Sequence, residues 1–160
     1  MRGLAMVPAA LLVVAILGPA PAIAQTETSV TGAGAGVFPS GASYLGVPLK
    51  ALELGMGLSV AGSWAIGQFE TTLIGVADSG LEQDIVLEGQ ATSSTASGPD
   101  NAIFSGTCTV DLGDGTPPVP GVPFTVAVTA NAEGTGSLTL TLAGTDLPAA
   151  TVNEGSITIR

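Results

Sequence analysis

The sequence predicts an all-β domain: a single antiparallel β-sandwich of jelly-roll or Ig-like type, with about 8 to 10 strands. Three observations support this. Apolar residues alternate with polar ones along most of the chain, as in half-buried strands. Clusters of Asp, Asn, Gly and Pro separate these runs, and no run has the apolar spacing of an amphipathic helix. The same pattern is also typical of a small barrel, so sandwich and barrel both stay open at this point.

The chain begins with a predicted export signal, residues 1–24. Arg2 supplies a positive charge, an apolar run spans 9–17, and a small-x-small sequence ends at Ala24, after which we expect cleavage. An uncleaved membrane anchor is the alternative, but a spanning helix needs about 20 apolar residues and a Gly-Pro pair interrupts this run. We therefore expect a secreted, extracellular or cell-envelope protein, exported by the general secretory route, with one domain at 25–160.

In the N-terminal half of this domain, the pattern predicts short strands around 37–38 and 44–45. Leu and Met alternate with Glu, Gly and Ser over 52–60, which predicts a half-buried strand. The stretch 64–77 is less regular because its apolar parity shifts around Gly67. We expect two strand pieces there, joined by a bulge or bend.

In the C-terminal half, apolar residues again occupy one face of each run and Thr, Ser or Glu the other, which predicts further half-buried strands. These runs are 85–90, 104–112, 124–130, 137–142 and 156–160. Turn residues gather between the predicted strands, most clearly at 78–80, 97–101, 114–118 and 131–136.

A Gly-Ala repeat occupies residues 32–36. A glycine-rich phosphate-binding loop would open a helix, and no helical pattern follows this repeat. We therefore interpret it as a closely packed or flexible segment where a strand starts.

Cys108 is the single cysteine and so cannot form an internal disulfide. It falls on the apolar face of the run at 104–112, with Phe104 and Val110. This position favours a buried, inert thiol over a reactive thiol or a disulfide between chains.

The charge of the exported domain is strongly acidic, because Lys50 and Arg160 are its only basic residues against 13 acidic ones. Such a charge repels phosphate groups, so we expect no nucleic-acid partner and no anionic membrane surface as a partner. We expect no membrane insertion after signal cleavage either, because one Trp, one Tyr and four Phe are too few for the aromatic girdles of a membrane barrel. The candidate partners are an envelope or extracellular protein, or a glycan. The oligomeric state stays open.

Histidine is absent, which excludes the Ser-His and Cys-His nucleophile pairs and the usual zinc sites. We therefore expect no enzyme. Paired carboxylates are the remaining catalytic possibility, since a glycosidase needs only two, although aromatic residues to hold a sugar are few. The carboxylates considered are Glu53, Glu70, Glu82, Asp84 and Glu88.

Calcium is the one cofactor that the acidic residues could hold. The stretch 111–115 resembles the start of an EF-hand loop, but Gly113 stands at a ligand position and Val122 where the closing Glu belongs. A looser oxygen-ligand site could form where loops meet. Its candidates are Asp78, Glu82, Asp84, Asp111 and Asp114. We favour the interpretation that these residues form turns, and expect no cofactor.

The order of motifs in residues 84–160 is similar to that of post-COAP domains, the C-terminal β-modules of secreted bacterial proteins. The resemblance rests on an A-x-F-x-G strand at 102–106, the apolar strands at 123–128 and 138–142, and a closing I-x-I strand at 157–159. The Asp-rich turn that often precedes the last strand in that family is missing here. The resemblance implies a β-sandwich without a catalytic role.

These observations favour a non-catalytic secreted or envelope-associated β-module that acts by binding or assembly. The first alternative is a carrier of a small apolar ligand, in a pocket lined by Leu residues with Met56, Trp64 or Phe69. The second is a carboxylate-dependent hydrolase. An interior pocket of a few hundred Å³ would favour the carrier, whereas a filled core would favour recognition at the surface.

Overall fold

The computed structural model describes residues 27–160, apart from the side chains of residues 96 and 97. The predicted signal at 1–24 lies outside the described residues. Within 27–160 no helix is long and apolar enough to cross a membrane.

The described chain consists of β-strands joined by turns, and all strand pairs are antiparallel, which confirms the predicted all-β antiparallel class. Burial alternates along most of the long strands, as expected for β-structure, because a period of two places apolar residues on one face of a sheet. The ten strands are β1 (Thr28–Val37), β2 (Ser43–Tyr44), β3 (Val47–Ala61), β4 (Trp64–Val76), β5 (Glu82–Ser97), β6 (Asn101–Asp111), β7 (Val119–Ala130), β8 (Gly136–Leu142), β9 (Thr145–Asp146) and β10 (Ala150–Ile159).

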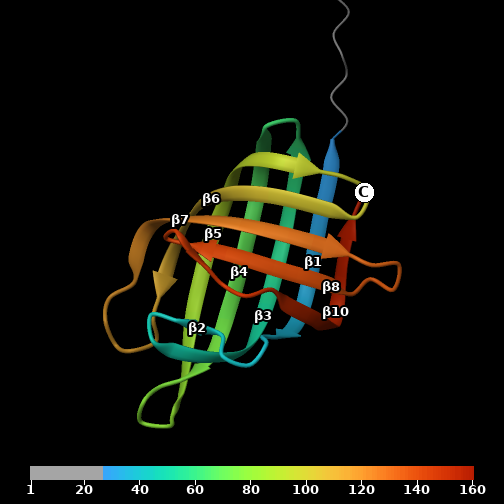
Figure 1. The fold of residues 1–160 in the computed structure, drawn as a ribbon. Coiled ribbons are helices and arrows are strands. Elements are labelled where there is room, and N and C mark those ends of the chain that lie inside the picture. The colour runs from blue at the N-terminus through green and yellow to red at the C-terminus, as the bar shows by residue number, and fades with distance from the viewer. Residues whose placement is uncertain (1–26) are drawn as a thin grey trace, which may run out of the picture.

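The strands form one sheet that closes on itself. Consecutive long strands pair from β3 to β8, β8 pairs with β10, and β1 pairs with both β10 and β3. A sheet closed in this way is a barrel. In Figure 1, strands β1, β3, β4 and β5 form one layer, and β6, β7 and β8 cross in front of it. The two layers therefore belong to one continuous sheet.

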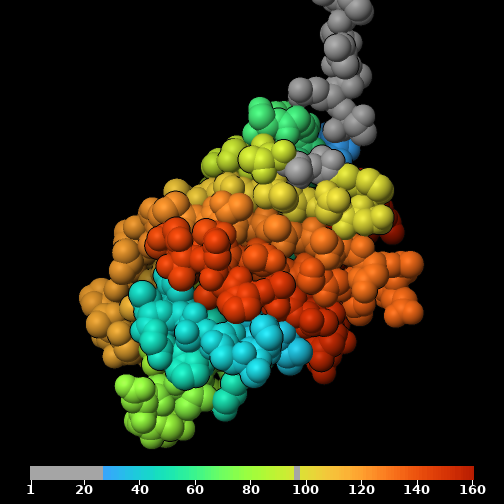
Figure 2. Space-filling model, in the orientation of Figure 1, coloured from blue at the N-terminus to red at the C-terminus, as the bar shows by residue number. Residues whose placement is uncertain are grey.

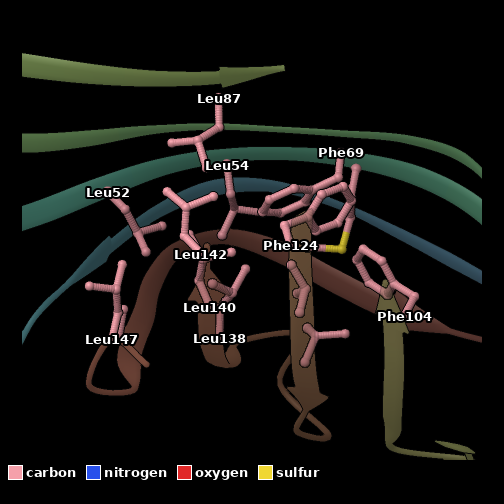
Figure 3. Close-up of a cluster of buried hydrophobic side chains, with 14 of the residues drawn as sticks. Leu52, Leu54, Phe69, Leu87, Phe104, Phe124, Leu138, Leu140, Leu142 and Leu147 are labelled. Carbon is pink, nitrogen blue, oxygen red and sulfur yellow. The ribbon is translucent and has the colours of Figure 1, made fainter. Parts of the chain in front are cut away.

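The inner face of this sheet is filled with large apolar side chains (Figure 3). Three phenylalanines from three strands meet at its centre. The rings of Phe69 and Phe124 are stacked with centroids 5.5 Å apart, and Phe104 contacts both rings edge-on at 5.9 and 6.4 Å. Leucines fill the space beside them, including Leu52, Leu54, Leu87, Leu138, Leu140, Leu142 and Leu147.

The segment around β2 covers one end of the closed sheet (Figure 1). Its side chains Ala42, Tyr44 and Leu49 are buried in the same apolar cluster. A tight turn at Leu45–Gly46, with φ of 49° and 87°, reverses the chain between β2 and β3. Figure 2 shows this cap in cyan, beside the orange-red chain around β9.

The stretch 64–77 forms one strand with a bulge, where two pieces with a bulge or bend were expected. The register with β5 shifts between Trp64 and Gly67, and Gly67 has a φ of 147°. A side chain at Gly67 would collide with the backbone of Gly57 and Leu58. This close approach of β3 and β4 explains the glycine. The apparent change in apolar parity has another cause, because Trp64 and Ile66 are apolar residues on the exposed face.

The Gly-Ala repeat at 32–36 lies inside β1, a full strand. A side chain at Gly34 would collide with the backbone of Glu154 on β10, and one at Gly36 with that of Thr151. The interpretation as a closely packed segment is confirmed. The strand itself was not expected beyond residues 37–38.

Candidate functional site

The thiol of Cys108 lies on the inner face of β6 and is 4 % exposed, so the predicted burial is confirmed. Its Sγ–H donates a hydrogen bond to the carbonyl oxygen of Val122 at 3.4 Å. Desolvation raises the pKa of the Cys108 thiol to about 11, so that it is protonated at neutral pH. This thiol is part of the core.

Two of the candidate calcium ligands hold the turn between β6 and β7. The Asp111 carboxylate accepts a hydrogen bond from the backbone N–H of Gly113 at 2.9 Å. The Asp114 carboxylate accepts one from the Thr116 hydroxyl at 2.6 Å and one from the Thr116 N–H at 2.9 Å. These bonds lower the pKa of Asp114, the side-chain bond having the largest effect. Both acids therefore act as turn-forming residues.

The other three candidates lie around the β4–β5 turn. Asp78 is in the turn, and Glu82 and Asp84 are exposed at the start of β5. Among residues 27–160, no group of three or more His, Cys, Asp or Glu side chains could hold a metal ion. Calcium binding by these three residues, the alternative that the sequence analysis did not favour, stays untested.

The strand register brings acidic residues together on the outer face of β3–β6. Glu70 of β4 lies directly opposite Glu88 of β5, and Glu88 lies opposite Thr109 of β6. In the next row, Glu53 of β3 lies opposite Thr72. These three glutamates are exposed, because they alternate with the buried residues of their strands.

Four shallow hollows follow this face, with volumes of about 220, 240, 170 and 240 Å³. Adjacent hollows share residues: Glu70 lines three of them, and Glu88 joins the β4–β5 hollow to the β5–β6 hollow. We call these four hollows together the acidic groove. Its carboxylates are Glu53, Glu70, Glu88 and Asp111. Among the described residues that line it, none is basic or aromatic.

The floor of the acidic groove on β3 contains two glycines in the middle of a strand. Gly55 and Gly57 occupy outward-facing positions, and a Cβ added at either would meet no atom within 4 Å. Neither has a positive φ. Neither packing nor backbone conformation therefore requires glycine at these positions, and the missing side chains leave the floor open.

An apolar pair continues the same face of β4 beyond the groove. Trp64 and Ile66 alternate with buried Ala65 in the same parity as Gln68 and Glu70. They are 43 % and 66 % exposed. The outer face of β4 is therefore apolar at Trp64 and Ile66 and polar from Gln68 to Thr72.

The sequence singled out Glu53, Glu70 and Glu88 by residue type, without placing them together. The groove residues Gln68 and Gln90, and the floor glycines, were missed. Two glycines on the polar face of the run at 52–60 were the available signal, since glycine is disfavoured within strands.

Comparison with known protein families, curated proteins and solved structures finds no match to this chain.

The chemistry available in the acidic groove is recognition of charge and hydrogen-bonding groups. A glycosidase acid must hold its proton near neutral pH, usually through an apolar, desolvated environment. Glu70 and Glu88 are both exposed and their hollow is lined by polar side chains. The groove thus presents carboxylates, carboxamides and hydroxyls to solvent.

Proposed function

We propose that this protein is an exported, non-catalytic β-module that acts by binding through its outer surface. The observation that carries this proposal is the contrast between an interior packed with apolar side chains and an outer face with shallow hollows lined by carboxylates. The predicted export signal at 1–24 supports a secreted or envelope location. The resemblance of residues 84–160 to post-COAP domains agrees with a module of this kind.

For the finer fold, we infer an up-and-down closed sheet in place of a jelly-roll or Ig-like sandwich. The pairing of long strands with their neighbours in the sequence supports this. In jelly rolls and Ig-like sandwiches, Greek-key connections separate consecutive strands.

The alternative of an apolar-ligand carrier gains little from the geometry. Met56 and Phe69 are buried in the core, but Trp64 lies on the outer face. The three residues therefore do not line a common interior pocket. The hydrolase alternative has a facing pair of glutamates in its favour, but it lacks a desolvated carboxyl group.

The test exposes the exported protein to immobilised peptides and oligosaccharides of varied charge, and analyses each probe afterwards by mass spectrometry. We expect at least one probe to be retained without change in mass. Turnover of a probe that a single carboxylate substitution abolishes would overturn the proposal in favour of a hydrolase. An apolar molecule bound to the protein in native mass spectra would overturn it in favour of a carrier.

A further inference from the structure

We infer that the β2–β3 and β4–β5 turns together dock a segment of another exported protein in which one apolar side chain is flanked by Lys or Arg. This inference rests on the proposed function, and it names one surface and the chemistry of its partner. We call this surface, turn residues 45–46 and 77–82, the leucine end.

Two leucines at the leucine end are the most exposed large apolar side chains of the described chain. Leu45 is 70 % exposed and Leu81 is 71 % exposed. Both are close to Ala77, since Leu45 and Ala77 line the same hollow and the Ala77 N–H donates a hydrogen bond to the Leu81 carbonyl oxygen at 2.8 Å. In Figure 2 the yellow-green β4–β5 turn lies next to the cyan cap. Exposed apolar residues that occur singly are common, whereas neighbouring ones often mark a binding surface.

Leu45 also has an unfavourable backbone conformation. Its φ of 49°, with 87° at Gly46, belongs to a two-residue hairpin turn in which both residues have positive φ, and such turns favour Asn, Asp or Gly. The β8–β9 turn has the same conformation, with φ of 51° and 79°, and has the small Ala143 at the first position. A bulky residue with positive φ is uncommon. Because the Leu45 side chain is exposed, packing within the fold does not compensate for this strain.

A hollow of about 160 Å³ lies between the two turns. Its lining residues are Leu45, Gly46, Val47, Ala77, Asp78 and Gln83. Sites for small molecules have volumes of about 300–1,000 Å³, so this hollow suits one side chain better than a whole ligand. Three of the lining residues are apolar, which favours an apolar side chain as the occupant.

The charge around the leucine end is acidic. Asp78 lines the hollow, and Glu82 and Asp84 are exposed at the start of β5. Neither basic residue of the described chain lines the hollow, because Arg160 lies beside the start of β1, at the opposite end of the sheet, and Lys50 lies at the register shift in β3. Basic side chains on both sides of the inserted apolar one would complement this charge.

Other occupants fit these observations less well. A second copy of this chain, or an anionic lipid surface, would bring further negative charge to the acidic turns. A metal ion needs several ligand side chains around one point, and residues 27–160 offer no such group. A basic segment with one apolar side chain uses the leucines, the hollow and the carboxylates together.

The first experiment titrates the exported protein with the peptide Lys-Ser-Lys-Leu-Lys-Ser-Lys and follows the backbone amide signals by NMR, which detects weak binding. We expect the largest shifts at residues 45–47 and 77–83. A second peptide with serine at the central position should bind about three- to tenfold more weakly, because it lacks the apolar side chain. Added salt should weaken the binding of both peptides, because it screens exposed charges.

A second experiment separates docking from folding. Asn suits the turn conformation of residue 45, so L45N should have a Tm equal to or higher than that of the natural chain. We expect it to bind the leucine peptide about three- to tenfold more weakly, and L81S to lose binding by a similar factor. The matched control A143N makes the corresponding change in the β8–β9 turn, outside the hollow, and should leave binding unchanged.

The remaining outcomes decide between surfaces and partners. Equal binding of the leucine and serine peptides would show attraction by charge alone and overturn the inference, as would unchanged binding in either leucine variant. A lower Tm in L45N would overturn it too, because Leu45 would then stabilise the fold. Shifts confined to the acidic groove would overturn the leucine end but leave surface binding, the proposed function, intact. If neither peptide binds while another immobilised probe is retained, only the inference fails, and if no probe is retained, the proposed function fails as well.

Discussion

Glycines in the middle of strands have opposite surroundings on the two faces of this sheet. Gly89 lies on the inner face of β5, where an added Cβ would be 2.7 Å from Cε1 of Phe124 and 3.0 Å from Cβ of Cys108. Gly55 lies on the outer face of β3, where an added Cβ meets nothing within 4 Å. The inner glycine is explained by packing, because the aromatic cluster occupies the space. Packing does not explain the outer glycine, Gly55, which indicates a role other than stabilising the fold.

The largest expected loss of stability comes from disrupting the cluster of three phenylalanines, which leaves no room for a side chain at Gly89. Substitution F69A removes the ring that contacts both other phenylalanines. We expect the free energy of unfolding to fall by about 4 kcal/mol, measured by urea denaturation. A loss below about 1 kcal/mol would mean that the interior is loosely packed and would revive the apolar-ligand carrier.

The matched pair G89T and G55T tests the comparison directly. At position 89 the new side chain clashes with Phe124 and buries a hydroxyl, so we expect a loss of about 3 kcal/mol. At position 55 it enters open space in a strand. There we expect a gain of about 0.5 kcal/mol, since Thr favours strands over Gly. Both values come from the same denaturation experiment, and two changes of the same sign would invalidate the distinction between the faces.

Raising the pH tests the packing around Gly89, because the buried thiol of the neighbouring Cys108 loses its proton at alkaline pH. Burial raises the pKa of this thiol from 9.0 to about 11. The neutral thiol therefore stabilises the fold fully below about pH 9, and this contribution is lost as pH rises through 11. We expect a loss on the order of 2 kcal/mol across this range, obtained from denaturation at each pH.

The variant C108A isolates the contribution of the thiol. Burial, and to a smaller extent Cys108, also raises the pKa of Tyr44, so part of the alkaline destabilisation should persist in C108A. A pH dependence identical to that of the natural chain would show that Cys108 does not titrate in this range. Rapid labelling of the native thiol at neutral pH would contradict its burial.

The smallest expected change in the free energy of unfolding comes from the facing pair Glu70 and Glu88. Removing one charge in E70Q relieves the repulsion with Glu88 and should raise the free energy of unfolding by a few tenths of a kcal/mol. High salt should reduce the difference from the natural chain. A decrease in stability would mean that Glu70 makes a favourable contact within the sheet.

The sequence predicted most long strands and, in the alternating runs that it singled out, which face is buried. The buried thiol of Cys108 followed from alternation at 104–112, and a bulge or bend was expected near Gly67, where the register shifts. Strand β1 was largely missed, because its Gly-Ala repeat has low strand propensity. Its pairing with β3 and β10 on both edges supplies the stability that its composition lacks.

By itself, the sequence determined that this chain forms an antiparallel β-sheet and which side of most main strands faces the core. Alternation along one strand carries that information, because successive side chains point to opposite faces. It carries no information about the neighbouring strand. The tertiary structure alone decided that the sheet closes and that Glu70 faces Glu88. The facing of Glu70 and Glu88 depends on the register that the β4–β5 turn sets, which runs unbroken from Val76 and Glu82 to Gly67 and Ala91. Closure depends on the pairing of β1 with both β3 and β10.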